Sequence, residues 1–197
     1  MEKYTLPNLF YGYKDLEPAM SENQLTIHHQ KHHQAYVNGC NALVEKMDKA
    51  RKENTDVDFR AVSKEFSFQI GGHVLHSLFW NNLAPVGKGG EITGELKEKI
   101  IEDFGSIERL KKEFNAVTLS VEGSGWATLV FEKESQKLMV MQIEKHNVNI
   151  FPASEIIMVL DMFEHAYYID YKNDKAKYVE EFWKIVNWEE IEKRFKI

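Results

Sequence analysis

A carboxylate and an imidazole directly follow a strongly apolar run of the chain. The run, Ile-Ile-Met-Val-Leu over residues 156–160, predicts a buried segment, and Asp161 and His165 come at its end. Burying these two polar groups without a partner would cost free energy. A metal ion would satisfy both, because anionic oxygen and neutral imidazole nitrogen are good ligands for first-row metals. We therefore expect the fold to bring further ligands to the end of this segment.

The composition is that of an ordinary globular protein. The residues are 43% hydrophobic and 28% charged. A length of 197 residues is enough for one or two compact domains. No apolar run approaches the roughly 20 residues of a membrane span, and no signal peptide is recognised, so we expect no membrane association and a cytoplasmic location. The single cysteine, Cys40, excludes an intrachain disulfide framework and fits a reducing compartment. The net charge of −6 gives no attraction to nucleic acid.

The first half of the chain predicts two long helices. Ser21 and Gln24 have the spacing of a capping box, which starts a helix expected to run to about Asn54 with a break near Gly39. Residues 59–80 predict the second helix, because their apolar side chains recur at alternating steps of three and four.

The second half predicts further helices and a small sheet. The expected elements are helices over 94–104 and 106–120, a hairpin of strands 126–132 and 138–144, a third strand over 156–161, and helical structure to the end. The loop over residues 84–90, rich in glycine, is the boundary candidate and divides the chain into domains 1–87 and 88–197. The predicted fold class is α+β: an N-terminal antiparallel helical hairpin followed by an α/β domain with a three-stranded antiparallel sheet.

Several of the eight histidines fall on faces predicted to point inward. An isolated histidine on an apolar helix face is usually a satisfied core residue. Inward-facing histidines from two helices and a strand end, together with Asp161, favour a shared centre instead. His29 and His33 form a separate helical stripe and are interpreted as helix-packing or surface positions. The inward-facing candidates are His28, His32, His73, His76, His146 and His165.

The spacing supports a site of three histidines and one carboxylate for iron, manganese or zinc, without choosing among them. A zinc-protease His-Glu-x-x-His and the Glu-x-x-His pairs of di-iron bundles are both absent. Two alternatives to a redox enzyme remain open, a non-enzymatic iron-binding helical protein and a zinc-dependent hydrolase.

Four segments carry most of the distinctive residues: Leu25–Val37, Gly71–Trp80, Gly123–Trp126 and Asp161–Tyr168. They resemble the iron/manganese superoxide dismutases, and the similarity runs from Tyr4 to Trp188. The resemblance implies a ping-pong enzyme that converts superoxide into dioxygen and hydrogen peroxide. It also implies one ion per subunit, held by His28, His76, Asp161 and His165, with iron expected and manganese, or either metal, as the alternative.

The same resemblance implies roles for residues around the metal. Tyr36 would be the gateway residue beside the substrate position, with His32 behind it. His146 stands in place of the usual glutamine that bonds the metal-bound solvent. Many iron enzymes carry that glutamine at the position of Gly72, so His146 is the expected solvent partner and a catalytic residue.

The remaining implied features concern the surroundings of the site and the assembly. Lys31 and Lys175 are the candidates for a cationic entrance. Glu164 and Tyr168 would reach across a two-fold interface to His165 and His32 of another subunit, giving a dimer, and the archaeal-like features imply a homotetramer. An apolar wall would consist of Trp80, Trp126 and Phe163, the last standing where tryptophan is usual.

Overall fold

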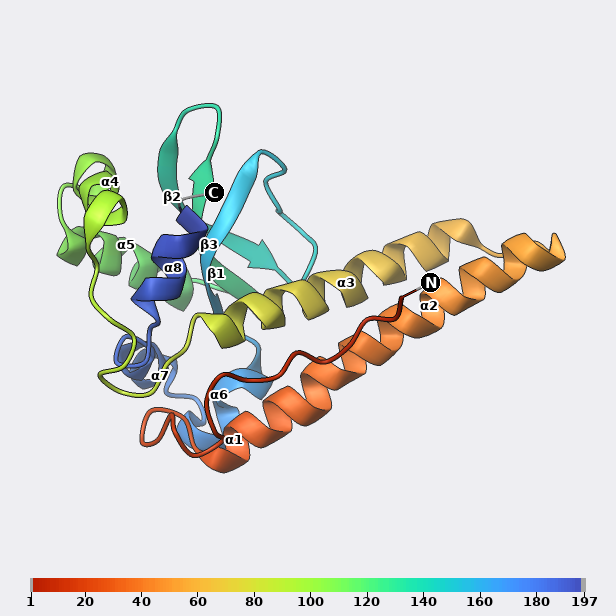
Figure 1. Ribbon diagram of the computed structural model, residues 1–197, viewed down its shortest axis with the longest axis horizontal. Helices are drawn as coiled ribbons and strands as arrows, with labels where there is room; N and C mark the ends of the chain where they lie inside the picture. The colour runs from red at the N-terminus through yellow and green to blue at the C-terminus, as the bar shows by residue number, and fades with distance from the viewer. Residues whose placement is uncertain (1, 196–197) are drawn as a thin grey trace.

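The computed structural model describes residues 2–195, which form a long helical hairpin joined to a part built from helices and a small sheet (Figure 1). No helix in this range is both long and apolar enough to cross a membrane. The predicted α+β architecture is confirmed. The helices are α1 (Glu22–Ile27), a π-helical segment (His28–His33), α2 (Gln34–Glu53), α3 (Phe59–Asn81), α4 (Gly94–Phe104), α5 (Ile107–Leu119), α6 (Glu164–Tyr171), α7 (Lys175–Phe182) and α8 (Trp188–Phe195).

The first helix begins as predicted but is interrupted elsewhere. The Ser21 hydroxyl accepts the Gln24 N–H at 3.1 Å and caps α1. The predicted break near Gly39 is wrong, because the irregular segment lies at His28–His33 and Gly39 is inside α2. A Cβ on Gly39 would lie 2.5 Å from Oε1 of Gln69 on α3. Glycine here serves the close approach of the two hairpin helices rather than a break.

An extended N-terminal arm runs along the hairpin (Figure 1). The backbone of Tyr4 exchanges two hydrogen bonds of 2.9 Å with the Asn41 side chain of α2. Farther along, the Tyr11 hydroxyl donates to the backbone carbonyl of Trp80 at 3.0 Å. The arm therefore ties both hairpin helices together close to the residues that α3 contributes to the predicted site.

The sheet is antiparallel with the order β2-β1-β3, from β1 (Gly125–Glu132), β2 (Lys137–Glu144) and β3 (Ser154–Asp161). All three predicted strands are thus confirmed. The register pairs Trp126 of β1 with Asp161 of β3, so one end of the sheet carries both residues.

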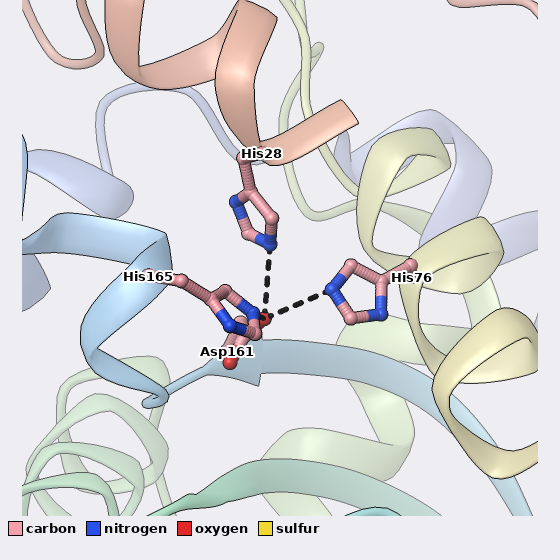
Figure 2. A group of neighbouring side chains, drawn as sticks. All are labelled: His28, His76, Asp161 and His165. Atoms are coloured by element: carbon pink, nitrogen blue, oxygen red, sulfur yellow. Dashed lines mark hydrogen bonds and ion pairs between the residues drawn. The ribbon is translucent and has the colours of Figure 1, made fainter. Parts of the chain in front are cut away.

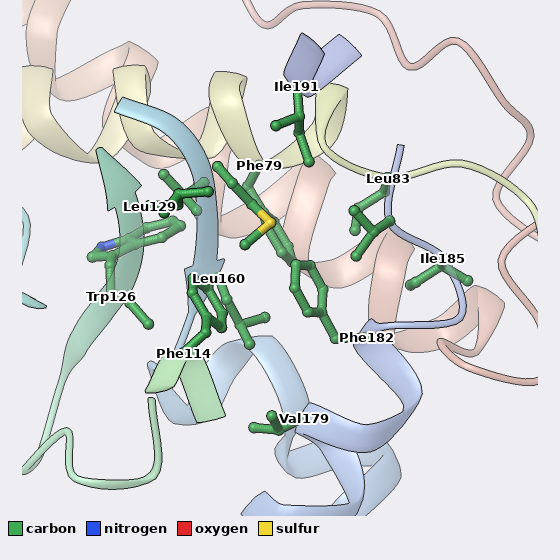
Figure 3. Close-up of a cluster of buried hydrophobic side chains, with 14 of the residues drawn as sticks. Phe79, Leu83, Phe114, Trp126, Leu129, Leu160, Val179, Phe182, Ile185 and Ile191 are labelled. Atoms are coloured by element: carbon green, nitrogen blue, oxygen red, sulfur yellow. The ribbon is translucent and has the colours of Figure 1, made fainter. Parts of the chain in front are cut away.

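The main core lies between α3, the sheet and the C-terminal helices (Figure 3). Phe79 of α3, Leu160 of β3 and Phe114 of α5 are fully buried there. Burial of each such side chain stabilises the fold by roughly 1.5–3 kcal/mol. This packing fixes α3 against β3 and thereby positions the polar residues those two elements carry.

Candidate metal centre

Four donor side chains from four separate elements converge on one point (Figure 2). His28 comes from the π-helical segment, His76 from α3, Asp161 from the end of β3 and His165 from the first turn of α6. Oδ2 of Asp161 lies 3.1 Å from Nε2 of His28, 3.4 Å from Nε2 of His76 and 3.2 Å from Nε2 of His165. All four donor atoms lie within 4.8 Å of one another.

Hydrogen bonds on the far side of two donors fix which atom faces the centre. Nδ1 of His76 lies 2.6 Å from the carbonyl of Gly72, which can only accept, so Nδ1 carries the proton and Nε2 presents a lone pair. That Nε2 is buried without a hydrogen-bond partner in the part of the chain that the structure describes. Oδ1 of Asp161 accepts the Phe163 N–H at 2.8 Å, which leaves Oδ2 for the centre. These outer contacts orient the donors as metal ligands are usually oriented.

The charges of the donors also suit a metal ion. Burial outweighs the bond to Asp161 and lowers the pKa of His28 to about 4, and burial lowers the pKa of His76 well below its ordinary value. Burial raises the pKa of Asp161, but the imidazoles of His165 and His28 lower it more, so the carboxyl ionises well below its usual range. Ligand atoms about 2.0–2.2 Å from one ion lie roughly 3 Å apart. The four groups therefore fit a single first-row metal ion.

His146 lies beside this centre with one ring nitrogen unpaired. Its ring is 5.8 Å from that of His76. The Trp126 indole N–H donates to Nδ1 of His146 at 3.0 Å, and Nε2 of His146 is buried with no hydrogen-bond partner among the described residues. Phe163 stacks on the His146 ring at 4.3 Å and on the His165 ring at 4.9 Å.

Tyr36 and His32 flank the donors on the helical side. The Tyr36 ring lies 5.1 Å from His76 and 4.6 Å from His146. Burial, followed by the charge of Asp161, raises the pKa of the Tyr36 hydroxyl, so it stays protonated at neutral pH. His32 stacks on His165 at 4.3 Å.

The two other wall residues pack edge-on against the ligand rings. Trp80 lies 4.7 Å from His28 at an interplanar angle of 76°, and Trp126 lies 5.0 Å from His76 at 84°. Both indoles are buried. Together with Phe163 they surround the donors with apolar surface, which strengthens the electrostatic interactions inside.

A surface hollow of about 290 Å³ gives access to the ligand His165. His32, Glu164 and Tyr168 also line it, and the lysine in its lining is Lys172. Of the two lysines expected from the sequence at the entrance, Lys175 begins α7 and Lys31 is exposed beside His32.

The two histidines interpreted as packing or surface positions are both packing positions. His29 donates from Nε2 to the Pro7 carbonyl at 2.9 Å, and its Nδ1 accepts from the Tyr13 hydroxyl at 2.8 Å. His33 is completely buried and bonds to His73.

Gln24 contributes to the centre in a way the sequence reasoning missed. Its buried side chain donates to the His165 carbonyl at 2.6 Å and accepts from the Ile169 N–H at 3.2 Å. A complete capping box would instead direct this amide to the Ser21 N–H, which donates to Asp170 at 2.8 Å. In the sequence, the signal that Gln24 belongs near the centre was its position one helical turn before the ligand His28.

Known proteins resemble nearly the whole chain. The family described as iron/manganese superoxide dismutases matches residues 3–84 with its alpha-hairpin domain and residues 92–194 with its C-terminal domain. An Fe superoxide dismutase of Methanothermobacter thermautotrophicus is 58% identical over 193 residues, 98% of this chain and 94% of that protein. An Fe superoxide dismutase of Pyrobaculum aerophilum is 48% identical over 194 residues, 98% of this chain and 92% of that protein. A Mn/Fe superoxide dismutase of Aeropyrum pernix is 46% identical over 194 residues, with 98% and 91% covered. The chain therefore belongs to the iron/manganese superoxide dismutase family.

Proposed function

We propose that this chain is a superoxide dismutase whose metal ion is held by His28, His76, Asp161 and His165. The observation that carries the proposal is the convergence of three buried donors and the partly buried His165 in a chain of this family. We propose iron as the ion and manganese as the alternative, since two of the relatives quoted are named for iron and one for both metals.

An iron or manganese ion in this site would supply two oxidation states. With them, one superoxide would be oxidised to dioxygen, and a second would be reduced and take up two protons to become hydrogen peroxide. The chain's own residues orient the donors and exclude bulk water. Gly72 holds His76 through its carbonyl, and the Phe163 N–H holds Asp161. Fixing the donors beforehand avoids reorganisation during the reaction.

We assign His146, Tyr36 and His32 to substrate binding and proton supply. With Nδ1 occupied by Trp126, His146 offers an Nε2–H donor, and such a donor stabilises an anionic oxygen more than a neutral one. The protonated Tyr36 hydroxyl gates the open side and passes a proton to the departing product. His32, half-buried in the surface hollow, connects this region to solvent.

We further propose that the subunit works as a homodimer and that two dimers form a tetramer. Glu164 is exposed and Tyr168 is 46% exposed, and both line the hollow that opens onto His165. Glu164 of one copy would pair with His165 of the other, and Tyr168 would pair with His32. The second copy would then cover the exposed edge of the metal centre.

The domain division and the cellular location are also proposals. We propose domains 1–87 and 88–197, because residues 84–90 form the linker between α3 and the later elements. We propose a cytoplasmic location, which the buried free thiol of Cys40 supports by fitting a reducing compartment.

Metal analysis combined with a superoxide assay tests the proposed function. Protein loaded separately with iron, manganese and zinc should consume superoxide with iron or manganese and not with zinc. Metal binding without superoxide consumption would favour a non-enzymatic iron-binding protein. Exclusive binding of zinc with hydrolytic activity would favour a zinc-dependent hydrolase.

A further inference from the structure

His33 is a fully buried histidine that the proposed reaction does not use. It lies five residues after His28, and in an uninterrupted α-helix the two side chains would point roughly 140° apart. The wider π-helical segment reduces this angle and turns His33 toward α3. Its ring consequently stacks on the ligand His76, with ring centroids 5.3 Å apart and an interplanar angle of 26°.

Two hydrogen bonds fix the tautomer of His33. The Trp80 indole N–H donates to its Nδ1 at 2.8 Å, and its Nε2 lies 2.8 Å from Nδ1 of His73. Because an indole nitrogen can only donate, Nδ1 of His33 accepts and Nε2 carries the proton. His33 then donates to His73. Trp80, His33 and the half-buried His73 thus form a chain of two hydrogen bonds in which each donor points away from the apolar wall.

Trp80 and His33 between them contact two of the four donors. Trp80 packs edge-on against His28 at 4.7 Å, and His33 packs on the face of His76. An indole needs an acceptor when it is buried, and His33 supplies the acceptor for Trp80. Loss of that acceptor would leave the Trp80 N–H unpaired in the interior. The indole ring would then rotate, or a water molecule would enter to accept the N–H.

We propose that His33 is a positioning residue of the metal centre, which acts by accepting the Trp80 N–H and by stacking on His76. The inference rests on the proposed metal site but not on any contact of His33 with the metal. Removing His33 should therefore alter the ligand field and affinity of the ion, in addition to destabilising the fold.

Three variants of the full chain test this role. His33→Leu removes the acceptor, His33→Gln supplies an amide able to accept from Trp80 and donate to His73, and Trp80→Phe removes the donor. Asn115→Leu is the matched control, because the Asn115 side chain on α5 accepts at 2.7 Å the indole N–H of Trp183, the residue that follows α7. Neither α5 nor α7 carries any of the four donors. The readouts are iron affinity by chelator competition, the optical spectrum of the iron-loaded protein and the unfolding midpoint.

His33→Leu should weaken iron affinity by about tenfold or more, the usual effect of removing a group that orients a ligand, and should shift the optical spectrum. His33→Gln should recover most of that loss. Trp80→Phe should weaken affinity on its own, and adding His33→Leu to it should cost less than in the wild type.

A different pattern would overturn the inference. If His33→Leu lowers only the unfolding midpoint, as expected for Asn115→Leu, His33 is purely structural. If His33→Leu does not fold, Trp80→Phe decides the question, and an unchanged iron affinity in that variant contradicts the proposed role. Wild-type protein that binds neither iron nor manganese would instead contradict the proposed function, so the two failures are distinguishable.

Discussion

The indole N–H of Trp126 donates to Nδ1 of His146 at 3.0 Å. Because the indole can only donate, the proton of neutral His146 resides on Nε2, which is buried and has no hydrogen-bond partner within the described residues 2–195. Burial lowers the pKa of His146 to about 4, so the ring remains neutral at physiological pH. A single hydrogen bond thus presents an N–H donor beside the four metal donors.

Trp126→Phe should retain the metal but impair turnover. Phenylalanine keeps the apolar contact with His76 but lets His146 adopt either tautomer, so the Nε2–H donor is no longer guaranteed. We expect kcat to fall about tenfold, with a changed pH dependence, and iron content to remain at the wild-type level. Steady-state kinetics across pH with parallel metal analysis measures this effect, and an unchanged kcat and pH profile would contradict it.

Replacing either of two adjacent glycines of α3 by alanine should change the free energy of unfolding by different amounts. A Cβ on Gly71 would overlap the backbone carbonyl oxygen of His146, whereas a Cβ on Gly72 would lie 2.8 Å from Cγ of the Tyr36 side chain, which can tilt. Gly71→Ala should therefore displace His146 and lower the free energy of unfolding by roughly 1–3 kcal/mol. Both changes gain about 1 kcal/mol from the helix propensity of alanine, but Gly72→Ala should cost less, because a side chain can move aside more readily than a backbone carbonyl. Urea unfolding of both variants measures the two losses of free energy of unfolding. A larger loss for Gly72→Ala than for Gly71→Ala would contradict the prediction.

The metal-free protein should lose stability as the pH falls from 7 to 5. Burial lowers the pKa of His28 and His146 to about 4 and that of His33 to about 3, below the 6.5 of an unfolded chain. Below about pH 6.5 these histidines bind protons in the unfolded chain but stay unprotonated in the folded chain. The free energy of unfolding then drops by about 1.4 kcal/mol per pH unit for each histidine that stays neutral.

Urea midpoints of metal-free protein at pH 5 and 7 measure this slope. Asp161 does not contribute in this window, because its depressed pKa stabilises the fold above about pH 4 and its contribution is lost only at lower pH. His33→Leu removes one of the neutral groups and should show a shallower slope. Equal midpoints at both pH values in the wild type would disprove the prediction.

Glu164→Gln should weaken the proposed dimer. The substitution removes the charge expected to pair with His165 of the second copy, and we expect the dissociation constant to rise by about tenfold or more. Glu98→Gln, an exposed carboxylate change on α4, is the control. Sedimentation equilibrium of both variants decides the question, since an unchanged dissociation constant for Glu164→Gln would place the interface elsewhere.

The sequence predicted the helices and strands because their signals are local. Gly105, with φ +83°, ends α4, and the Ser106 hydroxyl caps α5 by accepting the Arg109 N–H, as the glycine–serine pair indicated. The four converging donors were predicted from motifs in a known order. The signals for the helices and strands are residue types at short spacing, whereas the convergence of the four donors was implied by the resemblance of four segments to a known family.

The features that the sequence did not predict depend on contacts between distant segments. The π-helical segment differs from a regular helix by one extra residue in a turn, and no residue type in His28–His33 signals it. Gln24 bonds to α6, which lies more than a hundred residues later, although its spacing from Ser21 predicted a local bond. Gly39 marks a close contact with Gln69 rather than a helix break. In each case the partner is fixed only when the chain has folded.

The metal content of purified His76→Ala, compared with that of the wild type after identical loading, tests the central claim most directly. Nε2 of His76 is buried, has no hydrogen-bond partner among residues 2–195 and lies beside the other three donors, so its removal leaves an incomplete site. The wild type should bind one iron or manganese ion per chain, and His76→Ala should bind none and consume no superoxide. A His76→Ala protein that keeps one tightly bound iron or manganese ion per chain would contradict the assignment.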